Sequence, residues 1–235
     1  LALALALAAC APGASDTPAG ATTTQQAESE SARLNAWFDA QYEELLQLSP
    51  LQMTVLGRKD RYDELDDASP EADARRLAWL KTSVETMEST FDRDALDDET
   101  RLSWDLWKRQ YDSARDGAAF IADQYAFDQM NGMHSLLPTF LINFHKVDTE
   151  QDYTAYIARL NAAPRLLDQL IARGEASAAR GIRPPRFAFD GVIDQSRKVI
   201  AGAPFDGAPS ALWADLEAKA AALVEAGTID AARAD

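Results

Sequence analysis

The residues best suited to catalysis in this chain are its two histidines, His134 and His145, and its one cysteine, Cys10. A catalytic zinc ion needs two or three imidazole, thiolate or carboxylate ligands at fixed spacing, for example His-Glu-x-x-His on one helix. That motif is absent, and Gly132 and Pro138 interrupt the helix that would be needed to align the two histidines. We therefore expect no metal site and no catalytic residues within this stretch.

A polar segment with the sequence DQMNGMH occupies residues 128–134 of an otherwise apolar region. One interpretation places Asn131 and His134 on the wall of a substrate cleft. The other is a loop that caps the next helix, which we expect over residues 135–144. The least supported hypothesis is an enzyme complete within this chain that uses His134 with an acidic partner.

Two arginines flank a pair of prolines in the sequence Arg183-Pro-Pro-Arg186. Because proline disfavours helix in the residue before it, this segment is predicted to be an extended connector. It presents two guanidinium groups that could hold a substrate carboxylate bidentately. The alternative is that Arg183 and Arg186 pair with the many acidic side chains of the surface.

The elements that must position these residues are helices. From residue 32 onward apolar side chains recur every three or four residues, which is the pattern of an amphipathic helix. Ser49 and Ser69, each followed by proline, are predicted N-caps, and Thr149 with Asp152 resembles a capping box. Pro164 is expected to open a separate helix. Few segments alternate with period two, so we predict an all-α fold, a multi-helix array.

Composition narrows the function classes. The chain has 235 residues, of which 47% are hydrophobic and 26% charged, so it can bury a core in one large domain or two small ones. Its 23 basic and 38 acidic side chains give a net charge of −15. Such a surface repels phosphate, so we expect no nucleic-acid partner.

The first ten residues alternate leucine and alanine and end at Cys10. This run is too short to span a bilayer and is typical of a secretory signal that lacks its start. Residues 7–10, Leu-Ala-Ala-Cys, resemble the bacterial lipoprotein signal, which implies that the Cys10 thiol carries a lipid. A plain signal peptide with an incidental cysteine is the alternative. We expect a truncated lipoprotein signal segment in residues 1–10, a flexible tether in 11–31 and a helical domain in 32–235.

Several stretches resemble the bacterial domain-of-unknown-function family 885, over roughly residues 33–235. They are residues 131–138, 143–145, 149–160 and 181–187, the last containing Pro-Pro-Arg-Phe, which is the most specific piece. The resemblance implies an all-α fold similar to a zinc metallopeptidase, and members of the family are often lipoproteins. The family's metal motif, a His-Glu-x-x-x-x-His-His type helix, has no counterpart in residues 1–235.

The resemblance implies that this chain is the N-terminal half of a larger helical, metallopeptidase-like fold, incomplete at its C-terminus. The parent would be a lipid-anchored, zinc-dependent, peptidase-like hydrolase of the bacterial cell envelope, facing the periplasm or the exterior. Zinc and a peptide-like substrate are expected for the parent, while residues 1–235 alone would wall the cleft and be inactive. The alternative is a non-catalytic helical envelope lipoprotein that binds a partner or ligand.

Overall fold

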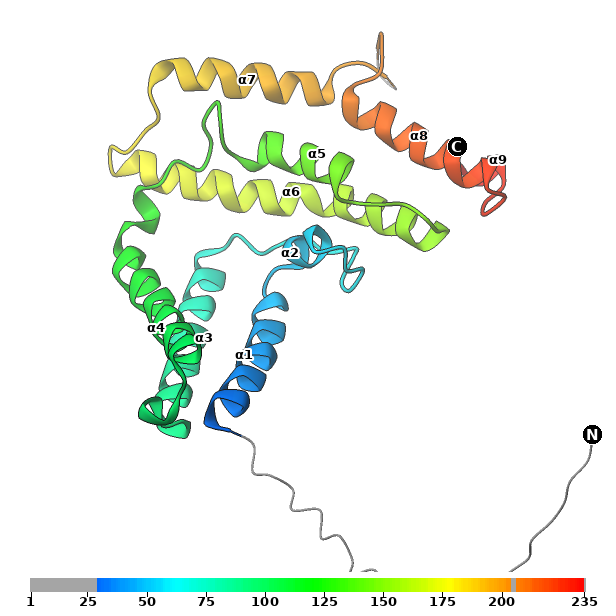
Figure 1. Ribbon diagram of the computed structural model, residues 1–235. Helices are drawn as coiled ribbons and strands as arrows, with labels where there is room; N and C mark the ends of the chain where they lie inside the picture. The colour runs from blue at the N-terminus through cyan, green and yellow to red at the C-terminus, as the bar shows by residue number, and fades with distance from the viewer. Residues whose placement is uncertain (1–28, 204–205, 235) are drawn as a thin grey trace, which may run out of the picture.

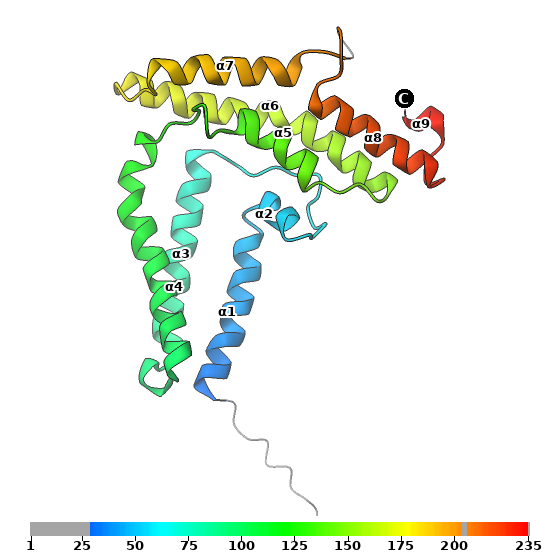
Figure 2. The ribbon, with the colours of Figure 1, turned by 45° about the horizontal axis from the view of Figure 1, so that its top comes forward.

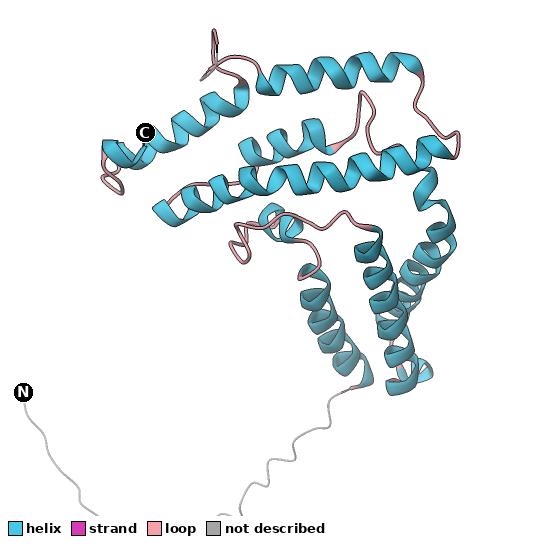
Figure 3. Cartoon of the chain, turned by 180° about the vertical axis from the view of Figure 1, so that it is seen from behind, coloured by secondary structure: helices cyan, strands magenta, loops and turns pink. Residues whose placement is uncertain are grey.

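The computed structural model describes residues 29–203 and 206–234, and all regular structure in these ranges is helical (Figures 1 and 3). The all-α prediction is therefore confirmed. The elements are α1 (Glu30–Leu46), α2 (Pro50–Val55), α3 (Pro70–Thr90), η1 (Arg93–Ala95), α4 (Asp98–Gly117), η2 (Ala118–Asp123), α5 (Met133–Asn143), α6 (Glu150–Ala179), α7 (Arg186–Ile200), α8 (Ala211–Glu225) and α9 (Ala231–Ala234).

The helices form two regions that meet near α2 (Figures 1 and 2). Helices α5, α6, α7 and α8 form a layered platform, and α1, α3 and α4 form an arm that extends from one side of it. The last part of α4 and η2 run up to the end of the platform where α6 stops. The arm and the platform each have a separate apolar core.

Most long helices begin at a side chain that accepts a hydrogen bond from a free backbone N–H. The predicted N-caps Ser49 and Ser69 accept from the amides of residues 52 and 72, and proline follows each of them. Thr149 and Asp152 form the predicted capping box at the start of α6. Helix α1 begins at Glu30, so it includes the last two residues of the predicted tether.

Two prolines lie inside helices, and only Pro138 was expected there, because it falls within the helix predicted over residues 135–144. The prediction that Pro164 opens a helix is wrong, because α6 runs without interruption from Glu150 to Ala179. Pro138 likewise lies within α5. An internal proline removes one backbone hydrogen bond and strains the preceding turn. Both helices bury apolar side chains around their proline, among them Leu137 in α5 and Leu166 in α6, and that burial offsets the cost.

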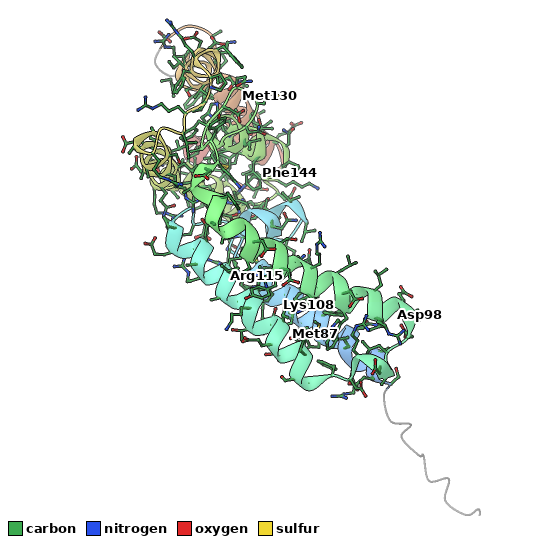
Figure 4. The ribbon with its side chains drawn as sticks, turned by 90° about the vertical axis from the view of Figure 1, so that its left-hand side faces the viewer. Met87, Asp98, Lys108, Arg115, Met130 and Phe144 are labelled. Carbon is green, nitrogen blue, oxygen red and sulfur yellow. The ribbon has the colours of Figure 1, made fainter. Side chains whose placement is uncertain are left out.

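The arm is held together by aromatic packing. Trp104 of α4 is buried with Leu34 of α1 and Met87 of α3. Trp37 and Trp107 lie at the edge of this core with ring centroids 5.9 Å apart in an edge-on arrangement. Figure 4 shows α3 and α4 side by side along the arm, and Lys108 of α4 pairs with Glu88 of α3 at 3.0 Å.

None of the described helices is long and apolar enough to cross a lipid bilayer.

Candidate functional site

Helices α6 and α7 and the segment after η2 converge at one end of the platform, on the left of Figure 1. An open cavity of about 340 Å³ lies among them. We call it the α6–α7 cavity. Its walls combine aromatic and branched side chains with small residues of α6, and Glu175 and Arg183 also line it. The apolar and aromatic lining residues are Tyr125, Phe127, Ile171, Phe189, Val192 and Ile193.

Local contacts fix the segments around this cavity. The buried hydroxyl of Ser177 lies 2.7 Å from the carbonyl oxygen of Ala122, which holds η2 against α6. Arg180 forms an ion pair with Asp123 at 2.6 Å, again between α6 and η2. The segment after η2 packs against α6 at Gly174, where an added Cβ would lie 3.7 Å from the Cβ of Ala126, an ordinary contact distance. The cavity is therefore built on fixed helices.

The Arg183-Pro-Pro-Arg186 connector is extended, as its prolines predict, and ends where α7 begins at Arg186. Gly181, at a φ of 86°, turns the chain out of α6. The Arg183 guanidinium donates a hydrogen bond at 3.2 Å to the carbonyl of Ala178 at the end of α6, which also accepts from the amide of Gly181. Arg183 lines the α6–α7 cavity, whereas Arg186 is exposed and does not.

The loop before α5 closes on itself around Asp128. One carboxylate oxygen of Asp128 accepts hydrogen bonds from the amides of Met130 and Asn131, both at 2.7 Å. These two backbone hydrogen bonds lower the pKa of the Asp128 carboxyl. The Asn131 side chain lies 3.3 Å from the same carboxylate and is otherwise exposed. The contacts of Asn131 are those of a loop residue, and it does not line the cavity.

His134 lies behind one wall of the cavity. Its Nε2 is 2.7 Å from Oε1 of Gln195 on α7, so Nε2 carries a proton and donates. Its ring meets the ring of Phe127, a lining residue, edge-on at 5.7 Å between centroids. His134 thus supports a cavity wall and does not reach the cavity itself. Of the predicted cleft residues, only Arg183 lies at the cavity and His134 lies next to it.

Three residues that join α7 to this loop were not singled out from the sequence. Gln195 donates to the carbonyl of Gln129 at 2.9 Å while it accepts from His134. A Cβ at Gly191 would come within 2.7 Å of the Gln129 Cβ, so glycine is needed for this close approach. The available signal was a glycine in the middle of a helical segment, four residues before a glutamine on the same face.

A second site, which is polar and buried, lies at the junction of platform and arm. We call it the Arg159 cluster, made of Thr54, Tyr62, His145 and Arg159. Arg159 is fully buried and donates to His145 Nδ1 at 2.8 Å, to the hydroxyl of Thr54 at 2.7 Å and to the carbonyl of Glu64 at 2.9 Å. Its guanidinium carbon lies 4.9 Å from the centroid of the Tyr62 ring.

The Arg159 cluster fixes the protonation of its histidine. Because arginine can only donate, Nδ1 of His145 must accept, and Nε2 then donates to the carbonyl of Asp152 at 2.9 Å. Burial, together with the charge of Arg159, lowers the pKa of His145 to about 4. Burial also lowers the pKa of Arg159 to about 10. Both side chains are closed to solvent, so this cluster stabilises the fold and offers no binding surface.

The described residues do not fit a zinc site. They contain no group of three or more His, Cys, Asp or Glu side chains placed to hold a metal ion. His134 and His145 belong to the two separate networks described above. Residues 29–203 and 206–234 therefore hold no such group of three ligands for the zinc that the family resemblance implies. Cys10, the predicted lipidation site, lies outside the described residues.

Comparison with models of protein families gives a match. The family model described as a bacterial protein of unknown function, DUF885, matches residues 50–234. That range covers the chain from the start of α2 to α9 and includes both the Arg159 cluster and the α6–α7 cavity. No curated protein matches the sequence.

Proposed function

The chain belongs to the bacterial DUF885 family, whose function is unknown, and from this premise we propose that it is the N-terminal helical portion of a lipid-anchored, zinc-dependent, peptidase-like hydrolase. In this proposal the described helices wall and shape the substrate cleft. The metal and the catalytic residues belong to other parts of the parent protein. The reaction of the parent is the hydrolysis of an amide bond by a metal-activated water.

One observation carries the proposal. The sequence stretch with the most specific family resemblance, residues 181–187, contributes Ile182, Arg183 and Pro184 to the wall of the α6–α7 cavity. Binding residues are found disproportionately on loops that a rigid scaffold holds in place. Here the scaffold is the pair of helices α6 and α7, and the loop between them is stiffened by two prolines.

The proposal is tested on the complete gene product. We expect the purified protein to contain about one zinc ion per chain, by metal analysis, and to cleave members of a peptide library. A chelator should abolish cleavage, and added zinc should restore it. A complete protein that binds no zinc and cleaves no peptide would overturn the proposal.

The lipid anchor has a separate test. In bacteria fed a clickable fatty acid, the wild-type protein should become labelled and sediment with membranes. A Cys10→Ala variant should lose the label, and a Ser15→Ala variant, changed a few residues further on, should keep it. A wild-type protein that is not labelled would remove the anchor from the proposal without affecting the hydrolase.

A second candidate function is a non-catalytic envelope lipoprotein that binds a ligand. The observation that favours it is the chemistry of the cavity walls, which are mainly apolar and suited to binding. The library experiment separates the two functions. Retention of a ligand by a complete protein that lacks zinc and activity would support the binding protein.

A further inference from the structure

The walls of the α6–α7 cavity expose apolar side chains that a folded chain would ordinarily bury. Phe189, Ile193 and Ile171 are each nearly half exposed, and all three line the cavity. A cavity of about 340 Å³ is at the small end of the roughly 300–1,000 Å³ that is usual for ligand sites. It has room for one aromatic or branched side chain rather than an extended ligand.

The interior of the cavity offers few hydrogen bonds. Gly174 and Ala178 of α6 contribute only small apolar surfaces to its lining. The hydroxyl of Ser177 is already engaged with the carbonyl of Ala122. A polar group placed among these residues would lose its hydrogen bonds to water without replacement. The part of a ligand that enters must therefore be apolar.

The rim of the cavity carries a cation without a carboxylate partner. Two nearby arginines of α6 are neutralised, Arg173 by Asp73 and Arg180 by Asp123. Arg183 forms no ion pair within the described part of the chain, and its side chain contacts a carbonyl at the end of α6. In a chain with a net charge of −15, an unpaired guanidinium beside an apolar cavity is suited to a ligand carboxylate.

We propose that the α6–α7 cavity binds the C-terminal residue of a peptide. An aromatic or branched side chain enters the cavity, and Arg183 pairs with the terminal carboxylate beside it. Glu175, which also lines the cavity, disfavours ligands with a second negative charge. This inference rests on the proposed function in one respect, since it takes the ligand to be a peptide.

The first test compares two ligands that differ only in charge. The 235-residue chain is titrated with N-acetyl-Gly-Gly-Phe and with its C-terminal amide, and binding is followed by ligand-observed NMR. We expect the acid to bind about fivefold more tightly than the amide, as suits a solvent-exposed ion pair with good geometry. Arg183→Gln should remove this preference, whereas Arg186→Gln, at the exposed position outside the cavity, should keep it.

The second test fills the cavity. Ala178→Leu places a larger side chain on the lining, and Ala176→Leu makes the same change at an exposed position of α6 that does not line it. We expect the first variant to weaken binding of the acid at least about tenfold and the second to leave it unchanged. Ile193→Glu, at a half-exposed lining position, gives the same result if Ala178→Leu fails to fold.

Several results would overturn the inference. They are absence of binding by either ligand, equal affinity for acid and amide, or affinity that is unchanged in both cavity variants. None of these measurements needs zinc or hydrolysis. A complete protein that does not cleave peptides would therefore remove the proposed function and leave this binding site standing. A chain that binds neither ligand would remove the site and leave the hydrolase untouched.

Discussion

In the Arg159 cluster charged and polar groups face one another inside the protein, whereas at the α6–α7 cavity the charged groups lie at an open rim. The two buried side-chain nitrogens that lack a partner among the described residues are Nδ1 of His134 and Nε of Arg173. Arg173 belongs to α6, which lines the cavity, and His134 packs against the lining residue Phe127, whereas neither belongs to the Arg159 cluster. The Arg159 cluster thus holds the fold together, whereas the α6–α7 cavity is arranged to bind a ligand.

The largest expected effect tests the cluster. Arg159→Ala leaves the Thr54 hydroxyl, the Glu64 carbonyl and Nδ1 of His145 without their donor and opens a cavity between Tyr62 and Phe140. We expect the free energy of unfolding to fall by about 4 kcal/mol, measured by urea denaturation. Arg197→Ala, an exposed arginine of α7, is the control and should change it by less than about 0.5 kcal/mol. A loss below about 1 kcal/mol in Arg159→Ala would contradict this role.

Acid should weaken the same cluster. The pKa of His145 is about 4 in the folded chain and 6.5 when unperturbed, so well above pH 6.5 the histidine is neutral in both states. As the pH falls from 6.5 to 4, the unfolded chain binds a proton that the folded chain does not, and stability is lost. We expect this group to account for roughly 3 kcal/mol of that loss.

The pH effect is isolated by comparison with His145→Gln. Other carboxylates also titrate in this range, so the relevant quantity is the difference in pH dependence between the two proteins. The variant should be less stable at about pH 7 and should lose less stability than the wild type between pH 6.5 and 4. The free energy of unfolding is measured by urea titration at each pH. If it changes equally with pH in the two proteins, the pKa of His145 is not lowered by burial in the cluster.

An intermediate effect is expected at the loop beside the cavity. Gly132 has a φ of 131° and a ψ of 148°, a conformation almost restricted to glycine, and an added Cβ would lie 2.7 Å from Nδ1 of His134. Gly132→Ala should reduce stability by about 2 kcal/mol. Gly57, at a φ of 81° and with open space around it, supplies the control, and Gly57→Ala should lose about 1 kcal/mol. Equal losses would mean that contact with His134 adds nothing.

The smallest effect should have the opposite sign. Gly174 is helical, and an added Cβ would make an ordinary contact with Ala126 at 3.7 Å. Gly174→Ala should therefore stabilise the chain by about 0.5 kcal/mol through helix propensity. Thermal unfolding followed by circular dichroism measures it. A destabilised variant would indicate that the cavity wall is packed as tightly as the core. The α6–α7 cavity would then differ less from the Arg159 cluster than we infer.

The sequence was most informative where structure is local. Serine followed by proline and the Thr149–Asp152 pair depend on neighbours a few residues away, and these helix starts are where the pattern predicts them. Pro164 was misread because the local cost of proline favours a helix break. Helix α6 stays continuous because Leu166 is buried in one core with residues far away in the sequence, such as Leu65. Local signals cannot reveal support that comes from distant segments.

The site was predictable only in part for the same reason. Arg183 could be singled out because two prolines hold it in an extended loop, and it lies at the cavity. Arg159 could not be, because its partners Thr54 and Glu64 are about one hundred residues away in the sequence. Asn131 and His134 share a segment, yet one belongs to a surface loop and the other supports a wall.

Helix α6 is continuous and contributes to both the Arg159 cluster and the α6–α7 cavity, with Arg159 and Gly174 fifteen residues apart. Each residue of an α-helix advances about 1.5 Å and rotates about 100° around the axis. Inserting or deleting a single residue between these two positions would swing the cavity wall about 100° away from the platform while the cluster stayed in place. Insertions and deletions among relatives of this chain should therefore accumulate in the connectors before and after α6. The number of residues between the two sites should stay constant.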